Sequence, residues 1–211
     1  MKVNEFVGQA IAILRSINVQ QLPEVVDGLY ESGIRFLEIA SDSHISDMGN
    51  AERISTVTEM GLPGLHVGAG TVVSAEGVQQ SAFAGAEFIL SPDSIGEVID
   101  MTKKLGLISI PGAFSPTEIR HAYDRGADIV KIFPAERLGT QYIKDLMAPM
   151  PGIPLCAVGG VNERNAAEFI ACGSTCVGIG SSLFPKNSEG IIDIAAMKDK
   201  AATLVSSLNE E

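Results

Sequence analysis

A glycine followed within a few residues by a short apolar run recurs along this chain, and it constrains the fold more than any other feature. The seven glycines are Gly33, Gly64, Gly85, Gly106, Gly126, Gly152 and Gly173. Each lies where a helix is expected to end, because glycine readily takes the left-handed conformation that closes helices. The runs that follow predict strands over residues 35–39, 65–67, 87–90, 107–110, 128–133, 154–158 and 175–179, and residues 11–15 add an eighth at the front.

The segments between these strands have the features of helices. Ser115, Pro116 and Glu118 together predict a helix start with a serine cap, a proline in the first turn and a capping box. Ser74 and Asn162 are expected to cap two further helices. Helical stretches are also expected over residues 22–29, 95–99 and 191–208.

Strands that are apolar along their whole length are typical of a parallel sheet covered by helices. Eight strand–helix units predict an α/β fold, a closed single-domain (β/α)8 TIM barrel spanning residues 1–211. The alternative is an open doubly wound sheet. It is less favoured because no G-x-G-x-x-G fingerprint follows the first strand.

Charge and composition exclude several classes of protein. The formal net charge is −11 and no cluster of Lys and Arg is present, so nucleic-acid binding is not expected. No apolar run reaches the roughly 18 residues of a membrane span, and the N-terminus lacks the features of a secretory signal. The cysteines (Cys156, Cys172 and Cys176) lack C-x-x-C spacing and the histidines lack metal-ligand spacing, so neither disulfides nor a metal site are expected. These features favour a cytoplasmic protein.

Lys131 is the most informative single residue. It lies inside the apolar run 128–133, whose β-branched and aromatic residues leave its side chain few routes to water. Because desolvation disfavours the ammonium form, we expect a lowered pKa for Lys131. A neutral lysine amine attacks carbonyl groups to form Schiff bases. The alternative is a lysine on the solvent face of an edge strand.

Polar residues gather at the carboxyl ends of the predicted strands, where barrel enzymes place their chemistry. Glu38 lies among apolar residues of the second strand, and a raised pKa there would suit a general acid/base. The alternative for Glu38 is a structural ion pair with Arg15 or Lys131. The remaining strand ends carry Thr71, Pro92, Pro111, Phe133, Gly159, Gly160, Gly180 and Ser181.

Two glycine-rich loops follow the last two predicted strands, at Gly159-Gly160 and at residues 178–181. Backbone N–H groups in such loops, together with a helix N-terminus, form the phosphate cradle common in this fold. The alternative is that these glycines serve loop geometry alone. In so acidic a protein, an anionic substrate must be attracted by local donors.

With these residues in hand, the chain resembles the class I 2-keto-3-deoxy-6-phosphogluconate (KDPG)/4-hydroxy-2-oxoglutarate (KHG) aldolases, which include 2-dehydro-3-deoxy-6-phosphogalactonate aldolases. The resemblance covers residues 8–185. Its landmarks, in order, lie at residues 13–15, 37–39, 68–72, 91–92, 111–112, 131–134, 158–161 and 178–181.

The resemblance implies a role for each candidate site residue. Lys131 matches the Schiff-base lysine that condenses with the C2 carbonyl of pyruvate, and Glu38 matches the general acid/base. Arg15 and Thr71 match positions that line the pyruvyl carboxylate pocket. The other matches are Pro92 and Phe133 in the pocket wall, and Gly159, Gly160, Gly180 and Ser181 in the phosphate loops. The family uses no metal or other cofactor and is typically trimeric, so a homotrimer is implied.

Two residues depart from the family pattern. Asp42 stands where some members have an arginine four residues after the glutamate, which removes an anion contact and places a negative charge near the pocket mouth. Val158 stands where gluconate-type enzymes often have threonine, and valine cannot hydrogen-bond a substrate hydroxyl. The surrounding sequence looks more like the phosphogalactonate relatives. The preferred C4 epimer, and cleavage of KHG, stay open.

The resemblance therefore implies a class I aldolase. It would cleave KDPG or its galactonate epimer reversibly to pyruvate and glyceraldehyde 3-phosphate, with these small molecules as its ligands. Two other classes stay open. A phosphate-binding barrel isomerase or synthase would use the same glycine loops without imine chemistry. A non-catalytic ligand-binding barrel would bind pyruvate or phosphate without turnover, and Asp42 keeps this reading open.

Overall fold

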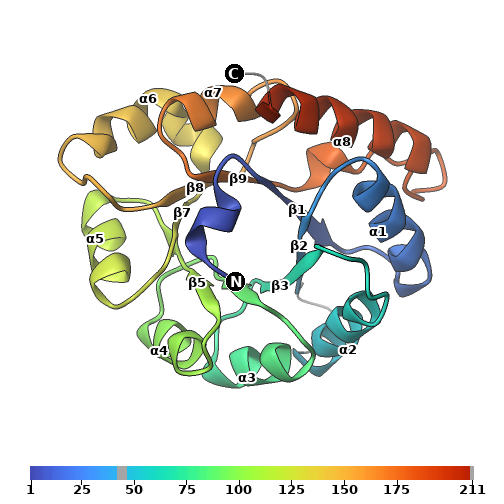
Figure 1. The fold of residues 1–211 in the computed structure, drawn as a ribbon, viewed down its shortest axis with the longest axis horizontal. Helices are drawn as coiled ribbons and strands as arrows, with labels where there is room; N and C mark the ends of the chain where they lie inside the picture. Colours follow the sequence, from blue (N-terminus) through green and yellow to red (C-terminus); the bar gives the residue numbers. More distant parts are fainter. Residues whose placement is uncertain (42–46, 210–211) are drawn as a thin grey trace.

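The chain folds into a ring of parallel strands surrounded by helices (Figure 1). The structure is a computed structural model that describes residues 1–41 and 47–209; Asp42 and His44 lie outside the described residues. One sheet contains β1 (Ala10–Arg15), β2 (Phe36–Ala40), β3 (His66–Gly70), β4 (Phe88–Leu90), β5 (Ile108–Ile110), β6 (Gly112–Ala113), β7 (Val130–Ile132), β8 (Leu155–Val158) and β9 (Cys176–Ile179). Its order is β5-β4-β3-β2-β1-β9-β8-β7-β6.

The fifth strand is divided at Pro111 into β5 and β6. Proline has no N–H to donate to a strand ladder, so regular pairing stops there. The two halves pair with different neighbours, β5 with β4 and β6 with β7. The carbonyl of Pro111 still accepts a hydrogen bond from the Lys131 N–H at 2.8 Å. The ring therefore closes through this divided strand, and the predicted TIM barrel is confirmed.

Most strands begin or end within one residue of the predicted bounds, but β3 and β7 differ by more. β3 runs on to Gly70, because its small residues Gly68, Ala69 and Gly70 do not stand out as an apolar run. β7 is shorter than residues 128–133. Asp128 is used in an ion pair with Lys103 and in a 2.8 Å hydrogen bond from the Ser109 N–H, so it anchors the strand's start without joining the ladder.

Helices cover the outside of the ring, and most of their predicted starts are confirmed. Ser74 accepts a hydrogen bond from the Gly77 N–H, and Ser115 and Glu118 form a capping box. The expected cap at Asn162 is wrong, because α7 begins at Ala166 and its N-cap is Asn165, three residues after Asn162. The helices are α1 (Leu22–Glu31), α2 (Asp47–Thr58), α3 (Ala75–Phe83), α4 (Gly96–Lys104), α5 (Pro116–Asp124), α6 (Ala135–Met147), α7 (Ala166–Ala171) and α8 (Ile194–Asn209), with 3-10 turns η1 (Val3–Phe6), η2 (Val19–Gln21) and η3 (Ser181–Leu183). Within residues 1–41 and 47–209, none of these helices is long and apolar enough to cross a bilayer.

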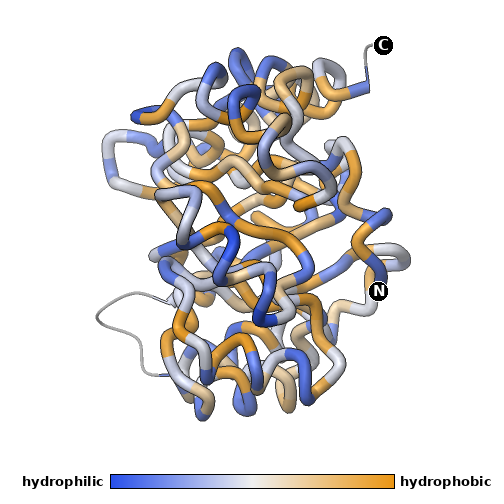
Figure 2. The backbone as a smooth tube through the Cα atoms, turned by 90° about the vertical axis from the view of Figure 1, so that its left-hand side faces the viewer, coloured by the Kyte–Doolittle hydropathy of each residue, from blue (hydrophilic) through white to orange (hydrophobic). Residues whose placement is uncertain are grey.

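Alternation along each strand separates two apolar layers. On β2, Leu37 and Ile39 pack against the helices, whereas Phe36 and Ala40 belong to the cluster inside the barrel. Because side chains alternate between faces, Glu38 must point inward as well. Figure 2 shows hydrophobic segments, in orange, running through the centre of the molecule.

The N-terminal turn η1 closes one end of the barrel and lies across its centre in Figure 1. Phe6 is completely buried, with its ring centroid 4.5 Å from that of Phe36 and 5.5 Å from that of Phe88. Phe36 and Phe88 begin β2 and β4, so the closed end is the amino end of the strands. Ligands are therefore expected to reach the interior from the carboxyl end.

Candidate active site

A pocket of about 390 Å³ opens at the carboxyl end of the barrel. All ten residues singled out from the sequence line it: Arg15, Glu38, Thr71, Pro92, Lys131, Phe133, Gly159, Gly160, Gly180 and Ser181. The remaining lining residues are Ile13, Val158, Val161 and Ser182. Residues from seven strand ends thus meet at one opening, as the barrel topology requires.

A carboxyl group and an amine enter the pocket from different walls. Glu38 occupies the middle of β2 and is 1% exposed, while Lys131 occupies the middle of β7 and is 7% exposed. Three strands separate β2 from β7 around the ring. Lys131 is therefore not on the solvent face of an edge strand, and that alternative is wrong.

Burial raises the pKa of the Glu38 carboxyl, and the nearby charges of Lys131 and Arg15 partly oppose this increase. Its Oε2 atom is buried and accepts no hydrogen bond from any described residue. Among the described residues, Glu38 forms no ion pair with either cation, so the structural ion pair considered for it is not found. A buried carboxyl with a raised pKa and an oxygen that accepts no hydrogen bond is suited to accepting and donating a proton.

The position of Glu38 depends on Gly70, at the end of β3. A Cβ atom at residue 70 would lie 1.6 Å from Glu38 Oε1 and 2.3 Å from its Cδ. Only glycine leaves room for the carboxylate here. The sequence interpretation missed this role, although a glycine inside a strand is a known sign of close approach by another group.

Phe133 partly covers Lys131 at the pocket rim. The Lys131 Nζ atom lies 4.8 Å from the centroid of the Phe133 ring, a cation–π distance. Phe133 is 41% exposed whereas Lys131 is 7% exposed, so the ring lies nearer to solvent than the lysine beside it. The amine is thereby kept close to the opening yet mostly dry.

Arg15 supplies a positive charge at the pocket mouth. Its Nη2 donates a 2.7 Å hydrogen bond to Thr71 Oγ1. Thr71 has a φ of +62°, which is rare for a β-branched residue and marks a constrained backbone. The pair presents a guanidinium in a fixed place, which is suited to binding a carboxylate.

A second arginine, which the sequence does not single out, hydrogen-bonds to the two strands that carry Glu38 and Arg15. Arg53 of α2 is buried and donates to the carbonyls of Ala40 at 3.1 Å and Leu14 at 3.5 Å. Ala40 is the last residue of β2 and Leu14 the last but one of β1, the strands that carry Glu38 and Arg15. A lone arginine within a helix gives no sequence signal for such a role.

The two glycine loops form the outer part of the pocket. Gly159 and Gly160 have φ values of +93° and +78°, conformations that favour glycine. Ser182 Oγ donates to the Val161 carbonyl at 3.0 Å and so ties the second loop to the first. Gly160 and Ser181 are exposed, so an anion bound here would lie nearer to solvent than Lys131.

None of the histidines and cysteines that the structure describes lines this pocket. His66, at the closed end of the barrel, is 3.0 Å from Glu87 and stacks on Phe36. Cys156 and Cys176 are buried on neighbouring strands. In the part of the chain that the structure describes, no group of three or more His, Cys, Asp or Glu side chains could hold a metal ion.

Comparisons by family model, by sequence and by structure all find similarity to the same group of proteins. The family model described as "KDPG and KHG aldolase" matches residues 5–198. The chain is 36% identical over 194 residues to a probable 2-dehydro-3-deoxy-6-phosphogalactonate aldolase of Rhizobium meliloti (strain 1021), covering 91% of this chain and 90% of that protein. It is 33% identical to the 2-dehydro-3-deoxy-phosphogluconate aldolase of Treponema pallidum (strain Nichols), covering 85% and 87%. A solved structure described as native KDPGal superposes with a TM-score of 0.83 at 31% identity, covering 94% of this chain and 93% of that one.

Proposed function

This chain belongs to the KDPG and KHG aldolase family, and on that premise we propose that it cleaves a 2-keto-3-deoxy-6-phospho sugar acid to pyruvate and glyceraldehyde 3-phosphate. One observation carries the proposal. A buried amine, Lys131, and a buried carboxyl of raised pKa, Glu38, enter the same pocket from different strands. An imine-forming aldolase needs this pair, one group to bind the carbonyl carbon and one to move protons.

The reaction begins when the Lys131 amine attacks the C2 carbonyl of the substrate. A carbinolamine forms, and loss of water gives a protonated imine between Nζ and C2. The C3–C4 bond then breaks, and its electron pair moves into the iminium to give an enamine. Glu38, directly or through water, takes the C4 hydroxyl proton, and C4 leaves as the aldehyde carbon of glyceraldehyde 3-phosphate.

The second half of the reaction releases pyruvate. The enamine is protonated at C3, which regenerates the imine, and water attacks C2 to release pyruvate and the free Lys131 amine. Glu38 gained a proton in the first half and can return it in the second, so one carboxyl serves as base and then as acid. Burial raises its pKa, which favours the protonated state that the second half requires.

The two ends of the substrate bind to different parts of the pocket. Arg15 and Thr71 take the C1 carboxylate, and the loops carrying Gly159, Gly160 and Ser181 take the phosphate. Phosphate binding, remote from the bond that breaks, supplies binding energy that holds the reacting carbons in place. Pro92 and Phe133 form the walls between these ends.

The preferred substrate is the galactonate epimer. Val158 lines the pocket at a point where a threonine would offer a hydroxyl to the substrate. An apolar wall gives no hydrogen bond that rewards the gluconate arrangement at C4. The 36% identity to a probable phosphogalactonate aldolase also supports this choice.

Reductive trapping tests the proposal. Sodium borohydride added with pyruvate is expected to leave a stable adduct on Lys131, found by peptide mass spectrometry, and Lys131→Ala should lower turnover by several orders of magnitude. The exposed Lys144→Ala variant is the matched control and should keep both adduct and activity. An unmodified Lys131, or near-normal cleavage by Lys131→Ala, would refute the imine mechanism.

The proposal extends to the oligomeric state and the cellular location. We propose that residues 1–211 act as one catalytic domain, that the protein is a cytoplasmic homotrimer, and that it needs no cofactor. Large apolar side chains on the surface, such as Phe83 at 97% exposure and Phe114 at 51%, support association with further copies. Light scattering combined with gel filtration measures the number of subunits directly.

A further inference from the structure

Two asparagine side chains hold the loop that follows β8. The amide nitrogens of Asn162 and Asn165 each donate a hydrogen bond of 3.2 Å to the Gly160 carbonyl. The side-chain oxygen of Asn165 accepts a 2.8 Å hydrogen bond from the Asn162 N–H. One amide group, that of Asn165, therefore satisfies a backbone acceptor and a backbone donor of the same loop.

Asn165 occupies the N-cap position of α7 but does not cap the helix. An N-cap asparagine ordinarily accepts a hydrogen bond from a backbone N–H in the first turn. Here the side chain makes no such bond. Its hydrogen-bonding groups face the glycine loop instead, which indicates that the geometry of this loop is what the residue maintains.

The direction of the Gly160 carbonyl fixes the direction of the next N–H. In the described residues the only cis peptide is Phe133–Pro134, so the Gly160–Val161 peptide is trans. In a trans peptide the C=O and N–H point in opposite directions. Gly160 and Val161 line the pocket, whereas Asn162 and Asn165 do not. Holding the carbonyl toward the asparagines therefore turns the Val161 N–H toward the pocket.

The Val161 N–H is available for a ligand. Val161 is 2% exposed, and no described residue accepts a hydrogen bond from its N–H. Buried backbone donors are almost always paired, so an N–H with no partner in a residue that lines the pocket is suited to a hydrogen bond with a bound ligand. The φ of +78° at Gly160 allows this peptide orientation.

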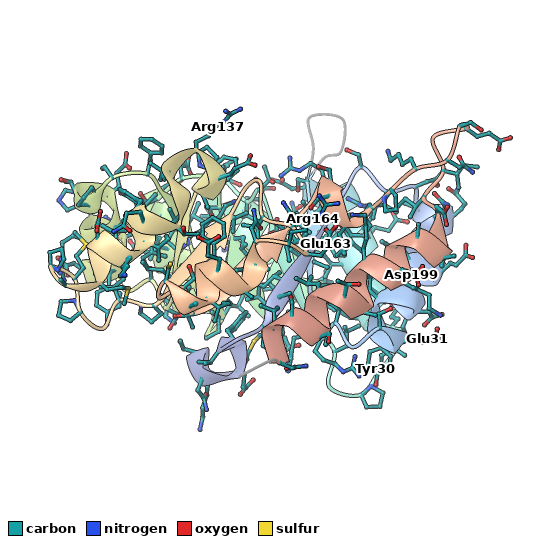
Figure 3. All side chains as sticks on the ribbon, turned by 90° about the horizontal axis from the view of Figure 1, so that it is seen from above. Tyr30, Glu31, Arg137, Glu163, Arg164 and Asp199 are labelled. Atoms are coloured by element: carbon teal, nitrogen blue, oxygen red, sulfur yellow. The ribbon has the colours of Figure 1, made fainter. Side chains whose placement is uncertain are left out.

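The loop is also anchored from outside. Glu163, labelled with Arg164 in Figure 3, accepts a 2.8 Å hydrogen bond from Lys200 Nζ of α8. On the other side, Ser182 Oγ donates to the Val161 carbonyl at 3.0 Å. The Val161 N–H thus belongs to a preorganised loop, as anion sites built from backbone donors require.

We propose that Asn165, assisted by Asn162, is a positioning residue that aims the Val161 N–H at the phosphate of the substrate. The inference rests on the proposed function, because it assigns the Gly159–Gly160 loop to phosphate. It adds that this loop binds phosphate only while the two side-chain amides hold the Gly160 carbonyl on the side away from the ligand.

The test compares phosphorylated and unphosphorylated aldehydes in the condensation direction. With pyruvate as donor, Asn165→Ala is expected to raise the KM for glyceraldehyde 3-phosphate about tenfold or more, because a donor to a charged group is misplaced. The KM for glyceraldehyde and the borohydride-trapped pyruvate adduct should stay within about twofold. Inorganic phosphate, used as a competitive inhibitor, should bind about tenfold more weakly.

Two further variants separate positioning from folding. Asn165→Asp keeps the acceptor for the Asn162 N–H but cannot donate to Gly160, so it should lose phosphate preference as Asn165→Ala does. Asn187→Ala is the matched control, since Asn187 also bridges backbone N–H groups of Glu189 and Ile191 in a turn outside the pocket. It should leave both KM values unchanged. If Asn165→Ala does not fold, Asn162→Ala replaces it, with a smaller loss in the same direction.

Each contrary result has a definite meaning. If Asn165→Asp lowers activity toward both aldehydes equally, or leaves the phosphate preference intact, the positioning role is refuted. If the unaltered enzyme gives no pyruvate adduct with borohydride, the proposed function itself fails. If the unaltered enzyme gives the adduct and Asn165→Asp keeps its phosphate preference, the inference is refuted but the proposed function is not.

Discussion

Replacing Gly70 by alanine should disable the catalytic carboxyl without touching it. The added methyl carbon would lie 1.6 Å from Glu38 Oε1, whereas real Cβ atoms come no closer than 3.0 Å to a neighbour. The carboxylate must therefore move by at least the difference, 1.4 Å. Gly70 does not have a positive φ, so alanine imposes no backbone strain at this position.

The expected loss follows from that displacement. Misplacing a catalytic group by about 1 Å costs on the order of a hundredfold in rate. A shift of 1.4 Å should therefore lower kcat for cleavage by about a hundredfold or more, roughly 2.7 kcal/mol in transition-state stabilisation. Trapping of pyruvate by borohydride on Lys131 after long incubation should persist, because the amine lies on a different strand.

A double-mutant cycle shows whether the effect passes through Glu38. Pyruvate release is measured with a lactate dehydrogenase couple for Gly70→Ala, Glu38→Gln and the combined variant. If Gly70→Ala acts only by displacing the carboxylate, it should cost little more in the Glu38→Gln background. An equal loss in both backgrounds, or near-normal kcat in Gly70→Ala alone, would refute the reasoning.

The other predictions concern charge and specificity. Because burial raises the pKa of Glu38 above 4.5, kcat/KM should fall as the pH drops through that raised pKa, and Glu38→Gln should abolish this acid limb. Glu38 also binds its proton more tightly when folded, so its contribution to stability is lost as the pH rises through the folded-state pKa; Glu38→Gln should raise Tm at pH 8, and the gain should disappear at pH 4. Val158→Thr should shift kcat/KM toward the gluconate epimer by about tenfold or less, measured on a panel of both phosphorylated epimers. Arg15→Lys should raise the KM for pyruvate about tenfold while leaving the KM for glyceraldehyde 3-phosphate unchanged, because lysine cannot bind a carboxylate in a bidentate manner.

The barrel could be predicted from the sequence because buried parallel strands are apolar on both faces. Short runs such as residues 176–179 therefore stand out between glycine-capped helices. The end of β3 is hard to recognise in the sequence because Gly68 and Gly70 do not form an apolar run. These positions need glycine because the Phe88 ring and the Glu38 carboxylate lie against them. Such a requirement arises from contacts between strands, which a single sequence does not display.

The residues that line the pocket could be predicted from the sequence, but the residues that hold them in place could not. Lys131 and Glu38 stand out because charged groups inside apolar strands are rare. Arg53 does not stand out, because an arginine on a helix is ordinary until its side chain is seen at the ends of β1 and β2. Asn162 resembles a helix cap in the sequence because asparagine caps and asparagine turns share the same local pattern, and only the position of α7 distinguishes them.

The turn that seals the amino end of the barrel with Phe6 has a kinetic consequence. In the proposed mechanism both products leave through the carboxyl end, and they are expected to leave in order. We expect the aldehyde, which the proposal places beside the exposed Gly160 and Ser181, to depart first, and pyruvate, which it attaches to the more deeply buried Lys131, to depart last. Pyruvate then competes with the substrate for the empty enzyme, whereas glyceraldehyde 3-phosphate gives mixed inhibition.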